Sequence, residues 1–77
     1  MSEFPDTNRQ EIAERLREAR KAAGLSQGQV ARLLQMHRPT ISEIEAGNRR
    51  VAADELRKLA ETYDVTASWL LDRKSVV

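Results

Sequence analysis

The side chains best suited to binding chemistry lie in the middle of this sequence, in the segment MHRPTISEIEAGNRR from Met36 to Arg50. Residues 25–50 contain four arginines against two glutamates, whereas residues 1–24 and 51–77 carry nearly equal numbers of acids and bases. Hydroxyl and amide side chains accompany these arginines. Because arginine and polar donors suit an anionic partner, the sequence predicts that an anion docks on residues 25–50.

The residue types give no support to catalysis or metal binding. The chain has no cysteine and a single histidine, His37, so the usual metal ligands are too few. No serine stands at a workable spacing from a histidine and an acid, and there is no glycine-rich phosphate loop. We therefore expect no enzyme activity, no cofactor and no metal. His37 is better explained as a helix cap or as a neighbour of a phosphate.

Composition restricts the chain to one small domain. With 77 residues, of which 40% are apolar and 32% charged, it can bury a single core. No apolar run approaches the length of a membrane span, and the first residues lack the pattern of a secretion signal. We expect a cytoplasmic protein that does not bind membranes. Since the formal net charge is only +1, it is the distribution of charge that favours a nucleic acid.

Helix signals recur along the chain, and strand signals are nearly absent. Ile12, Leu16, Ala19 and Ala23 form one apolar stripe, which Gly24 can end in a left-handed cap. The pattern predicts an all-α fold, a compact domain over residues 7–72 with five helices at about 8–23, 27–34, 38–46, 53–62 and 67–72. Residues 1–6 are expected to form a flexible arm and residues 73–77 a tail.

Several helix starts carry recognisable signals. Thr7 with Gln10 and Ser26 with Gln29 have the spacing of capping boxes. Pro39 fits the second position of the third helix, where its missing N–H has no acceptor in any case. Apolar residues also flank four helix starts as hydrophobic staples, in the pairs Leu25/Val30, Met36/Ile41, Val51/Leu56 and Val65/Leu70.

The second and third predicted helices are joined by only about three residues, 35–37. Their apolar positions fall where two steeply crossing helices would bury them, and the small Ala31 suits the point of closest approach. This arrangement is a helix-turn-helix.

The segments LSQGQVARLLQMHRPTISEIEAGNRR and ADELRKLAETYDVTASWLL resemble the lambda-repressor-like family of phage repressors and Cro proteins, also called the XRE family. The resemblance covers about Leu16 to Leu71. It implies that the third helix enters the major groove of double-stranded DNA with its first turn toward the base edges.

The resemblance places Arg38, Pro39 and Glu43 at base-reading positions. Arg38 can donate to guanine O6 and N7, Pro39 can contact a thymine methyl, and Glu43 can accept from cytosine N4. Glu43 has an alternative role, in which it repels wrong sequences and holds Arg38 or Arg49 in place. The residues implied to bind phosphates are Ser26, Gln27, Thr40, Ser42, Asn48, Arg49 and Arg50.

Other positions are implied to hold the scaffold. Glu45 matches a family glutamate that pairs with an arginine on the first helix, here Arg20. Gln35 stands where the family commonly has a left-handed glycine, which implies a strain of roughly 1 kcal/mol or a different turn. His37 and Ala52 replace the usual hydroxyl caps.

The last helix carries a group of apolar residues with two alternative roles. Trp69 is expected to pack in the core, with a dimer contact as the alternative, because family members often associate through this end of the domain. The same two alternatives apply to Val65, Leu70 and Leu71.

Together these features predict a sequence-specific transcriptional regulator, in the role of a repressor, that binds a near-palindromic operator as a homodimer. The alternative is a protein-interaction module of the antitoxin or adaptor type. Similar regulators are fused to, or encoded beside, a peptidase, a toxin or a restriction–modification component, so a protein partner is also considered. Since the chain stops soon after the fifth helix, the sequence leaves open whether a further domain belongs to it.

Overall fold

The computed structural model describes the backbone of residues 4–71 and the side chains of residues 9–71. Within this part of the chain, helices succeed one another without a strand. The helices are α1 Phe4–Ala22, α2 Gln27–Leu34, α3 Arg38–Glu45, α4 Ala53–Tyr63 and α5 Ala67–Leu71. The predicted all-α class and the helix-turn-helix of α2 and α3 are confirmed. The expected tail at 73–77 and the first three residues of the expected arm lie outside the described residues.

The start of α1 differs from the prediction. The helix begins at Phe4 rather than at Asn8, so residues 4–6 are helical and Thr7 is not its N-cap. Pro5 explains the difference, because a proline in the first helical turn lacks only an N–H that would have no intrahelical acceptor. At the other end the predicted left-handed stop is confirmed, with Gly24 at φ 76° and a 3.2 Å hydrogen bond from Leu25 N to Arg20 O.

The starts of α2 and α3 follow from local sequence. Ser26 is the N-cap of α2: its Oγ accepts from Gln29 N at 3.0 Å, and Gln29 Oε1 accepts from Ser26 N at 2.8 Å. This reciprocal pair is the predicted capping box. Pro39 stands in the first turn of α3 as expected, and His37 occupies the N-cap position without a side-chain capping bond.

The turn between α2 and α3 passes through Gln35, which has φ 57° and ψ 45°. The family's usual left-handed turn is therefore retained without its glycine. The backbone N–H of Met36 donates to Ala31 O at 2.8 Å and closes the end of α2. A residue with a Cβ in this conformation is strained by the contact of Cβ with the backbone.

Replacing Gln35 with glycine is expected to raise the free energy of unfolding by about 1 kcal/mol, because the Cβ contact is removed. Urea unfolding followed by circular dichroism measures the change. Gln35→Ala is the control: it keeps the Cβ and is expected to give no such gain. An equal gain in both variants would show that the gain does not come from relief of backbone strain.

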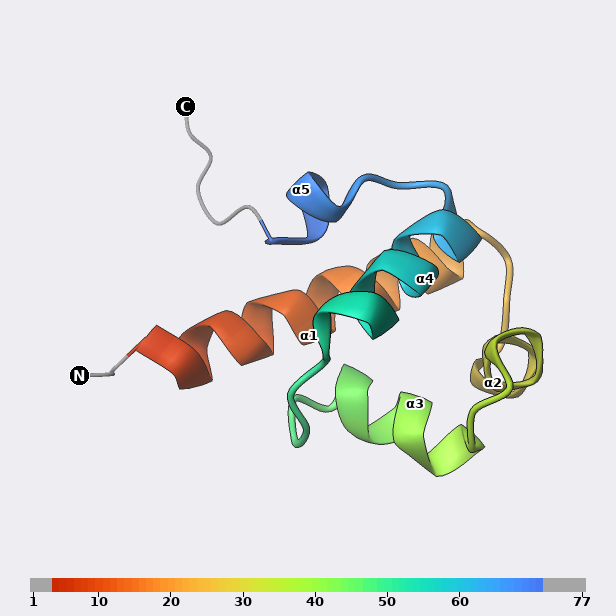
Figure 1. The fold of residues 1–77 in the computed structure, drawn as a ribbon, viewed down its shortest axis with the longest axis horizontal. Coiled ribbons are helices and arrows are strands. Elements are labelled where there is room, and N and C mark those ends of the chain that lie inside the picture. Colours follow the sequence, from red (N-terminus) through yellow and green to blue (C-terminus); the bar gives the residue numbers. More distant parts are fainter. Residues whose placement is uncertain (1–3, 72–77) are drawn as a thin grey trace.

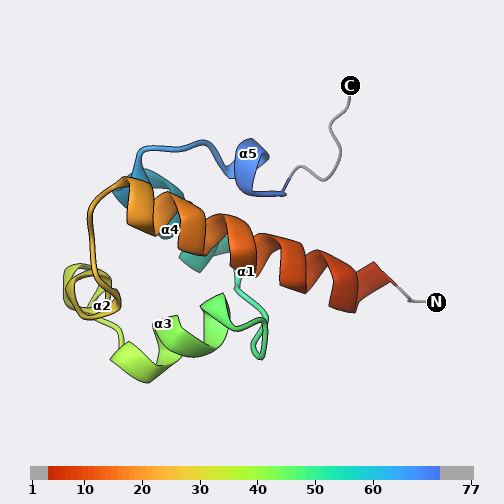
Figure 2. The ribbon, with the colours of Figure 1, turned by 180° about the vertical axis from the view of Figure 1, so that it is seen from behind.

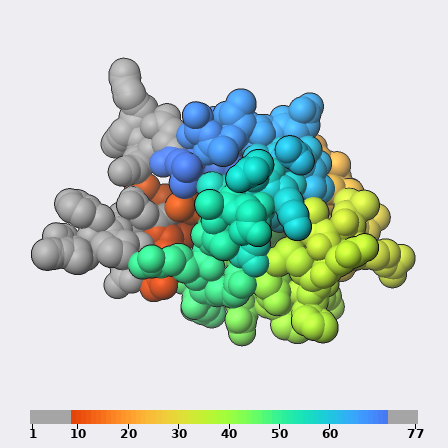
Figure 3. Space-filling model, viewed as in Figure 1, coloured from red at the N-terminus to blue at the C-terminus, as the bar shows by residue number. Residues whose placement is uncertain are grey.

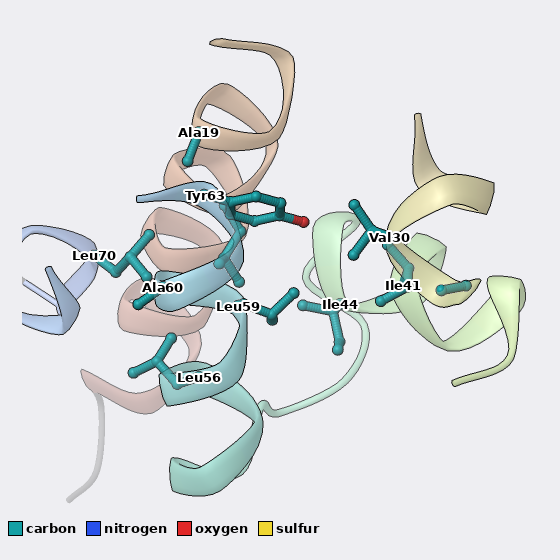
Figure 4. Close-up of a cluster of buried hydrophobic side chains, with 11 residues drawn as sticks. Ala19, Val30, Ile41, Ile44, Leu56, Leu59, Ala60, Tyr63 and Leu70 are labelled. Carbon is teal, nitrogen blue, oxygen red and sulfur yellow. The ribbon is translucent and has the colours of Figure 1, made fainter. Parts of the chain in front are cut away.

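Helices α1 and α4 lie in the middle of the molecule, with α2 and α3 on one side of them and α5 on the other, as Figures 1 and 2 show from opposite sides. The core lies between these helices. In Figure 4, Ile44 of α3 points toward Leu59 of α4, and Val30 and Ile41 lie where α2 packs on α3. The buried cluster consists of Leu16, Ala19, Val30, Ala31, Ile41, Ile44, Leu56, Leu59, Ala60, Tyr63 and Leu70.

Helix α5 divides its apolar residues between the core and the surface. Leu70 is 1% exposed and belongs to the core, so a dimer contact through it is ruled out in this conformation. Trp69 is 41% and Leu71 50% exposed, so the expectation that Trp69 packs in the core is wrong. Val65 is half-buried and packs against the core. Arg15 of α1 explains the placement of Trp69, because its guanidinium lies 5.5 Å from the centre of the indole ring and donates to the Trp69 carbonyl.

Candidate nucleic-acid interface

Helix α3 presents two chemically different faces. Ile41, Ile44 and Glu45 are buried, whereas Arg38, Pro39 and Glu43 are exposed. The helical repeat causes this division, because residues three or four apart share a face. The first turn of α3 therefore points outward. In Figure 3, the yellow-green to green surface of the end of α2, the turn and α3 gathers at the lower right, away from the blue surface of α5.

The start of α2 lies beside the start of α3. A Cβ built on Gly28 would lie 3.9 Å from Ser26 Oγ and 4.0 Å from Arg38 Cδ, so the Arg38 stem runs along the first turn of α2. The backbone N–H groups of Gln27 and Gly28 stand in this turn, where a helix offers them no acceptor. Free N–H groups and the helix dipole favour an anion at this end. A predicted base-reading side chain and a predicted phosphate site thus lie next to each other.

A buried ion pair joins α1 to the end of α3. Arg20 Nε donates to Glu45 Oε2 at 2.7 Å and Arg20 Nη2 to Glu45 Oε1 at 3.0 Å, which is the pair that the sequence predicts. The remaining terminal nitrogen, Arg20 Nη1, donates to Leu25 O at 2.9 Å. The hydrogen bond that Arg20 donates to Glu45 raises the pKa of Arg20, although burial opposes it. Glu45, only 4% exposed, thereby fixes the orientation of α3 against α1.

Burial also affects the nearby Tyr63, whose pKa it raises, and the charge of Glu45 raises this pKa further. Tyr63 therefore stays neutral near neutral pH. In Figure 4 its hydroxyl points from α4 toward Val30.

Gln27 is turned inward rather than toward a phosphate. Its Nε2 donates to Glu45 Oε1 at 3.1 Å, and the side chain is half-buried. The carboxylate of Glu45 draws the amide because it has acceptor capacity beyond its two bonds to Arg20. The side-chain amide of Gln27 is therefore not free for a phosphate in this conformation, and the predicted phosphate contact at Gln27, which rests on the free N–H groups of this helix start, stays a prediction. What Gln27 still offers to an anion is its backbone N–H.

Arg49 is likewise held by the protein itself. Its Nη1 and Nη2 donate to Oε1 and Oε2 of Glu55, both at 3.1 Å. The hydrogen bonds that Arg49 donates to Glu55 lower the pKa of Glu55 and raise the pKa of Arg49. Because the pKa of Glu55 is lowered on folding, its contribution to stability is complete above the ordinary glutamate pKa and is lost as the pH falls below it. Arg49, which the sequence analysis names as a phosphate contact, thus forms an ion pair with Glu55 in this structure.

The other predicted contacts lie on the same side of the molecule as α3 or at its end. Ser26, Ser42, Asn48 and Arg50 are exposed, and Thr40 is half-buried. Among the described residues, the side chains of Arg38, Glu43 and Arg50 have no hydrogen-bonding partner. These positions are therefore accessible to a ligand, and their roles toward DNA stay predictions.

Sequence reasoning missed three residues that shape this surface. Gly28 lies beside the Arg38 stem, and Glu55 pairs with Arg49 while accepting from Ala52 N at 3.1 Å. Glu55 has the spacing from Ala52 that a capping box requires. Because alanine is not a usual capping residue, the sequence does not reveal this capping role of Glu55. Gln10 is the third: its side chain covers Gly47, where φ is 78° and an added Cβ would come within 2.6 Å of Gln10 Nε2.

Two further observations concern the described residues. No helix within residues 4–71 is both long and apolar enough to cross a membrane. Among the side chains that the structure describes, no three histidine, cysteine, aspartate or glutamate groups come together as they would around a metal ion.

Comparison with solved structures finds the same architecture in regulators. The restriction–modification controller protein C.AhdI from Aeromonas hydrophila is 34% identical with a TM-score of 0.77, and the match covers 83% of this chain and 97% of that protein. A hypothetical transcription factor, NHTF, from Neisseria is 30% identical with a TM-score of 0.77 over 83% of this chain and 74% of its own. The DNA-binding domain of BldD is 28% identical with a TM-score of 0.77, over 94% of this chain and all of that domain.

Comparison of sequences agrees. The HTH-type transcriptional regulator DdrOP3 of Deinococcus deserti is 36% identical over 61 residues, which are 79% of this chain and 47% of the relative. The chain thus spans about half the length of the curated relative it matches. A family model described as Helix-turn-helix matches residues 16–70. The chain therefore belongs to the helix-turn-helix family of the lambda-repressor-like (XRE) type, whose members are DNA-binding transcription regulators and in general not enzymes.

Proposed function

We propose that this chain is a sequence-specific repressor that binds double-stranded DNA in the cytoplasm, with α3 in the major groove. The observation that carries the proposal is the exposed face of α3. Arg38 and Pro39 in the first turn and Glu43 in the next turn are exposed and have no task in the core. Arg38 donates to a guanine, Pro39 contacts a thymine methyl, and Glu43 accepts from a cytosine or rejects other bases.

Phosphate contacts set the register of α3 in the groove. Ser26 and the free N–H groups at the start of α2 bind one phosphate, beside Arg38. Asn48 and Arg50, after the end of α3, bind another. Thr40 and Ser42 are candidates for further contacts from α3 itself. Since the Gln27 amide is bonded to Glu45, its backbone rather than its side chain serves the phosphate.

The working form is a homodimer on a near-palindromic operator. Trp69 and Leu71 support this proposal, because they are large apolar side chains that α5 leaves exposed on a part of the surface away from α3. Pairing there leaves both copies of α3 free to enter successive major grooves, about 34 Å apart. The likeness to a restriction–modification controller supports a role in regulating such a gene set.

Selection of bound duplexes from a random pool tests the function. The enriched sequences are expected to contain two inverted half-sites with centres about one helical turn apart. A single half-site would contradict the dimer. Failure to enrich any motif would overturn sequence-specific binding and favour the alternative of a protein-interaction module.

Two substitutions separate base reading from phosphate binding. Arg38→Ala is expected to weaken binding by about 1–3 kcal/mol and to relax the base preference at one operator position. Arg50→Ala is expected to weaken binding to all sequences and to reduce the slope of log K against log salt by about one unit. Fluorescence anisotropy with a panel of single-base operator variants measures both effects. Equal losses on every sequence for both variants would show that Arg38 does not read a base.

A further inference from the structure

The pair formed by Arg49 and Glu55 stands at the edge of the proposed DNA surface. Arg49 follows the end of α3 between Asn48 and Arg50, and Glu55 lies in the first turn of α4. Both 3.1 Å bonds are made by the terminal nitrogens of the guanidinium, which are the groups that would grip a phosphate. The Arg49 side chain is 37% and the Glu55 side chain 21% exposed, so an incoming phosphate can reach the pair.

Arg49 differs in its side-chain bonding from Arg38 and Arg50, the other two arginines of the proposed DNA surface. Within the described part of the chain, the side chains of Arg38 and Arg50 are exposed and make no hydrogen bond. Only Arg49 among the three already has a carboxylate bound to both ends of its guanidinium. The charge of Glu43 also acts on Arg49, so a second acid lies on the same side of the molecule.

We propose that Glu55 competes with DNA phosphates for Arg49, so that Arg49 joins the DNA interface only by exchanging Glu55 for a phosphate. This inference rests on the proposed DNA-binding function and adds a way in which the protein itself limits its affinity for DNA. A partly exposed ion pair at the surface is weak enough to be exchanged, and a phosphate offers the same paired acceptor oxygens as a carboxylate. Because phosphates carry no base information, Glu55 lowers affinity for all sequences alike and leaves base choice unchanged.

Glu55 has a second task that makes the exchange possible without unfolding. Its Oε1 also accepts from Ala52 N at 3.1 Å and so caps the start of α4. When Arg49 leaves, this capping bond can remain. The carboxylate therefore stays ordered at the helix start and can take Arg49 back when the DNA dissociates.

The test is a double-mutant cycle between the two positions, with a mixed-sequence DNA duplex two helical turns long as the probe. Glu55→Gln keeps an oxygen for the Ala52 N–H but loses the charge that holds Arg49. It is expected to tighten binding about two- to fivefold, which corresponds to the strength of a surface ion pair. Arg49→Ala is expected to weaken binding and to lower the salt slope by about one unit. In the Arg49→Ala background, Glu55→Gln is expected to have no effect.

Asp54→Asn is the matched control, because Asp54 is exposed in the same helical turn and, among the described residues, has no hydrogen bond to Arg49. If Asp54→Asn tightens DNA binding as much as Glu55→Gln does, the effect is a general one of charge and the proposed exchange is overturned. Tightening that persists without Arg49, or an Arg49→Ala protein with unchanged affinity and slope, would overturn it as well. A wild-type protein that binds neither this duplex nor any selected sequence would instead overturn the proposed function.

A measurement on the wild-type protein gives an independent readout. The ¹³C chemical shift of the Glu55 carboxyl group is expected to change when the duplex is added, because the carboxylate loses Arg49. The change is expected to be absent in Arg49→Ala. An unchanged shift at saturating DNA would show that the pair stays intact in the complex and that Arg49 is only part of the scaffold.

Discussion

Replacing Arg20 with alanine is expected to lower the free energy of unfolding by about 3–5 kcal/mol, because it leaves the buried carboxylate of Glu45 without its counter-charge. Glu45 is 4% exposed and would retain only the amide of Gln27 among its side-chain partners. For a domain of this size the loss corresponds to a fall in Tm of roughly 12 °C or more. Differential scanning calorimetry measures it.

Arg57→Ala is the control for this experiment. Arg57 is exposed on α4 and its side chain makes no hydrogen bond to another described residue, so truncating this side chain is expected to change stability by about 0.5 kcal/mol or less. The double variant Arg20→Met/Glu45→Leu, which removes both charges, is expected to lose less stability than Arg20→Ala alone. If Arg20→Ala unfolds with the same free energy as the wild type, Glu45 does not depend on its counter-charge.

Replacing Ile41 with alanine is expected to destabilise the fold by about 2–5 kcal/mol, because it leaves a cavity where α3 packs on the core. Ile41 is 1% exposed, and its neighbour Val30 of α2 is fully buried. Urea unfolding measures the loss. Leu33→Ala removes a side chain of similar size from α2, but Leu33 is 61% exposed, so only a small change is expected. Equal losses in the two variants would show that the packing of α3 does not depend on Ile41.

The sequence predicts those helices best whose boundaries are set by local contacts. Helix α2 begins and ends where predicted, because Ser26 and Gln29 form a capping box within four residues of each other. The start of α1 could not be read in this way, since Phe4-Pro5 is compatible both with an irregular arm and with a first helical turn. The surface position of Trp69 depends on Arg15, 54 residues away, and a helix of only five residues has too few positions to define a buried face.

In the candidate site, too, some features could be predicted from the sequence and others could not. The helical period of α3 separates the buried Ile41 and Ile44 from the exposed Arg38, so that this division is readable from the sequence. The pairing of Arg20 with Glu45 came from the family resemblance. The partners of Gln27 and Arg49 could not be predicted. Each side chain can bond either to water or to a carboxylate, and only the folded structure shows which carboxylate lies close enough.

The division of labour on α3 has an evolutionary consequence. Its inner side chains and Glu45 set the orientation of the helix, whereas the side chains of Arg38 and Glu43 make no hydrogen bond to another described residue. Substitutions at these two outer positions therefore leave folding nearly unaffected. After duplication of its gene, one copy could acquire a new target sequence in a few mutations while inheriting an intact scaffold.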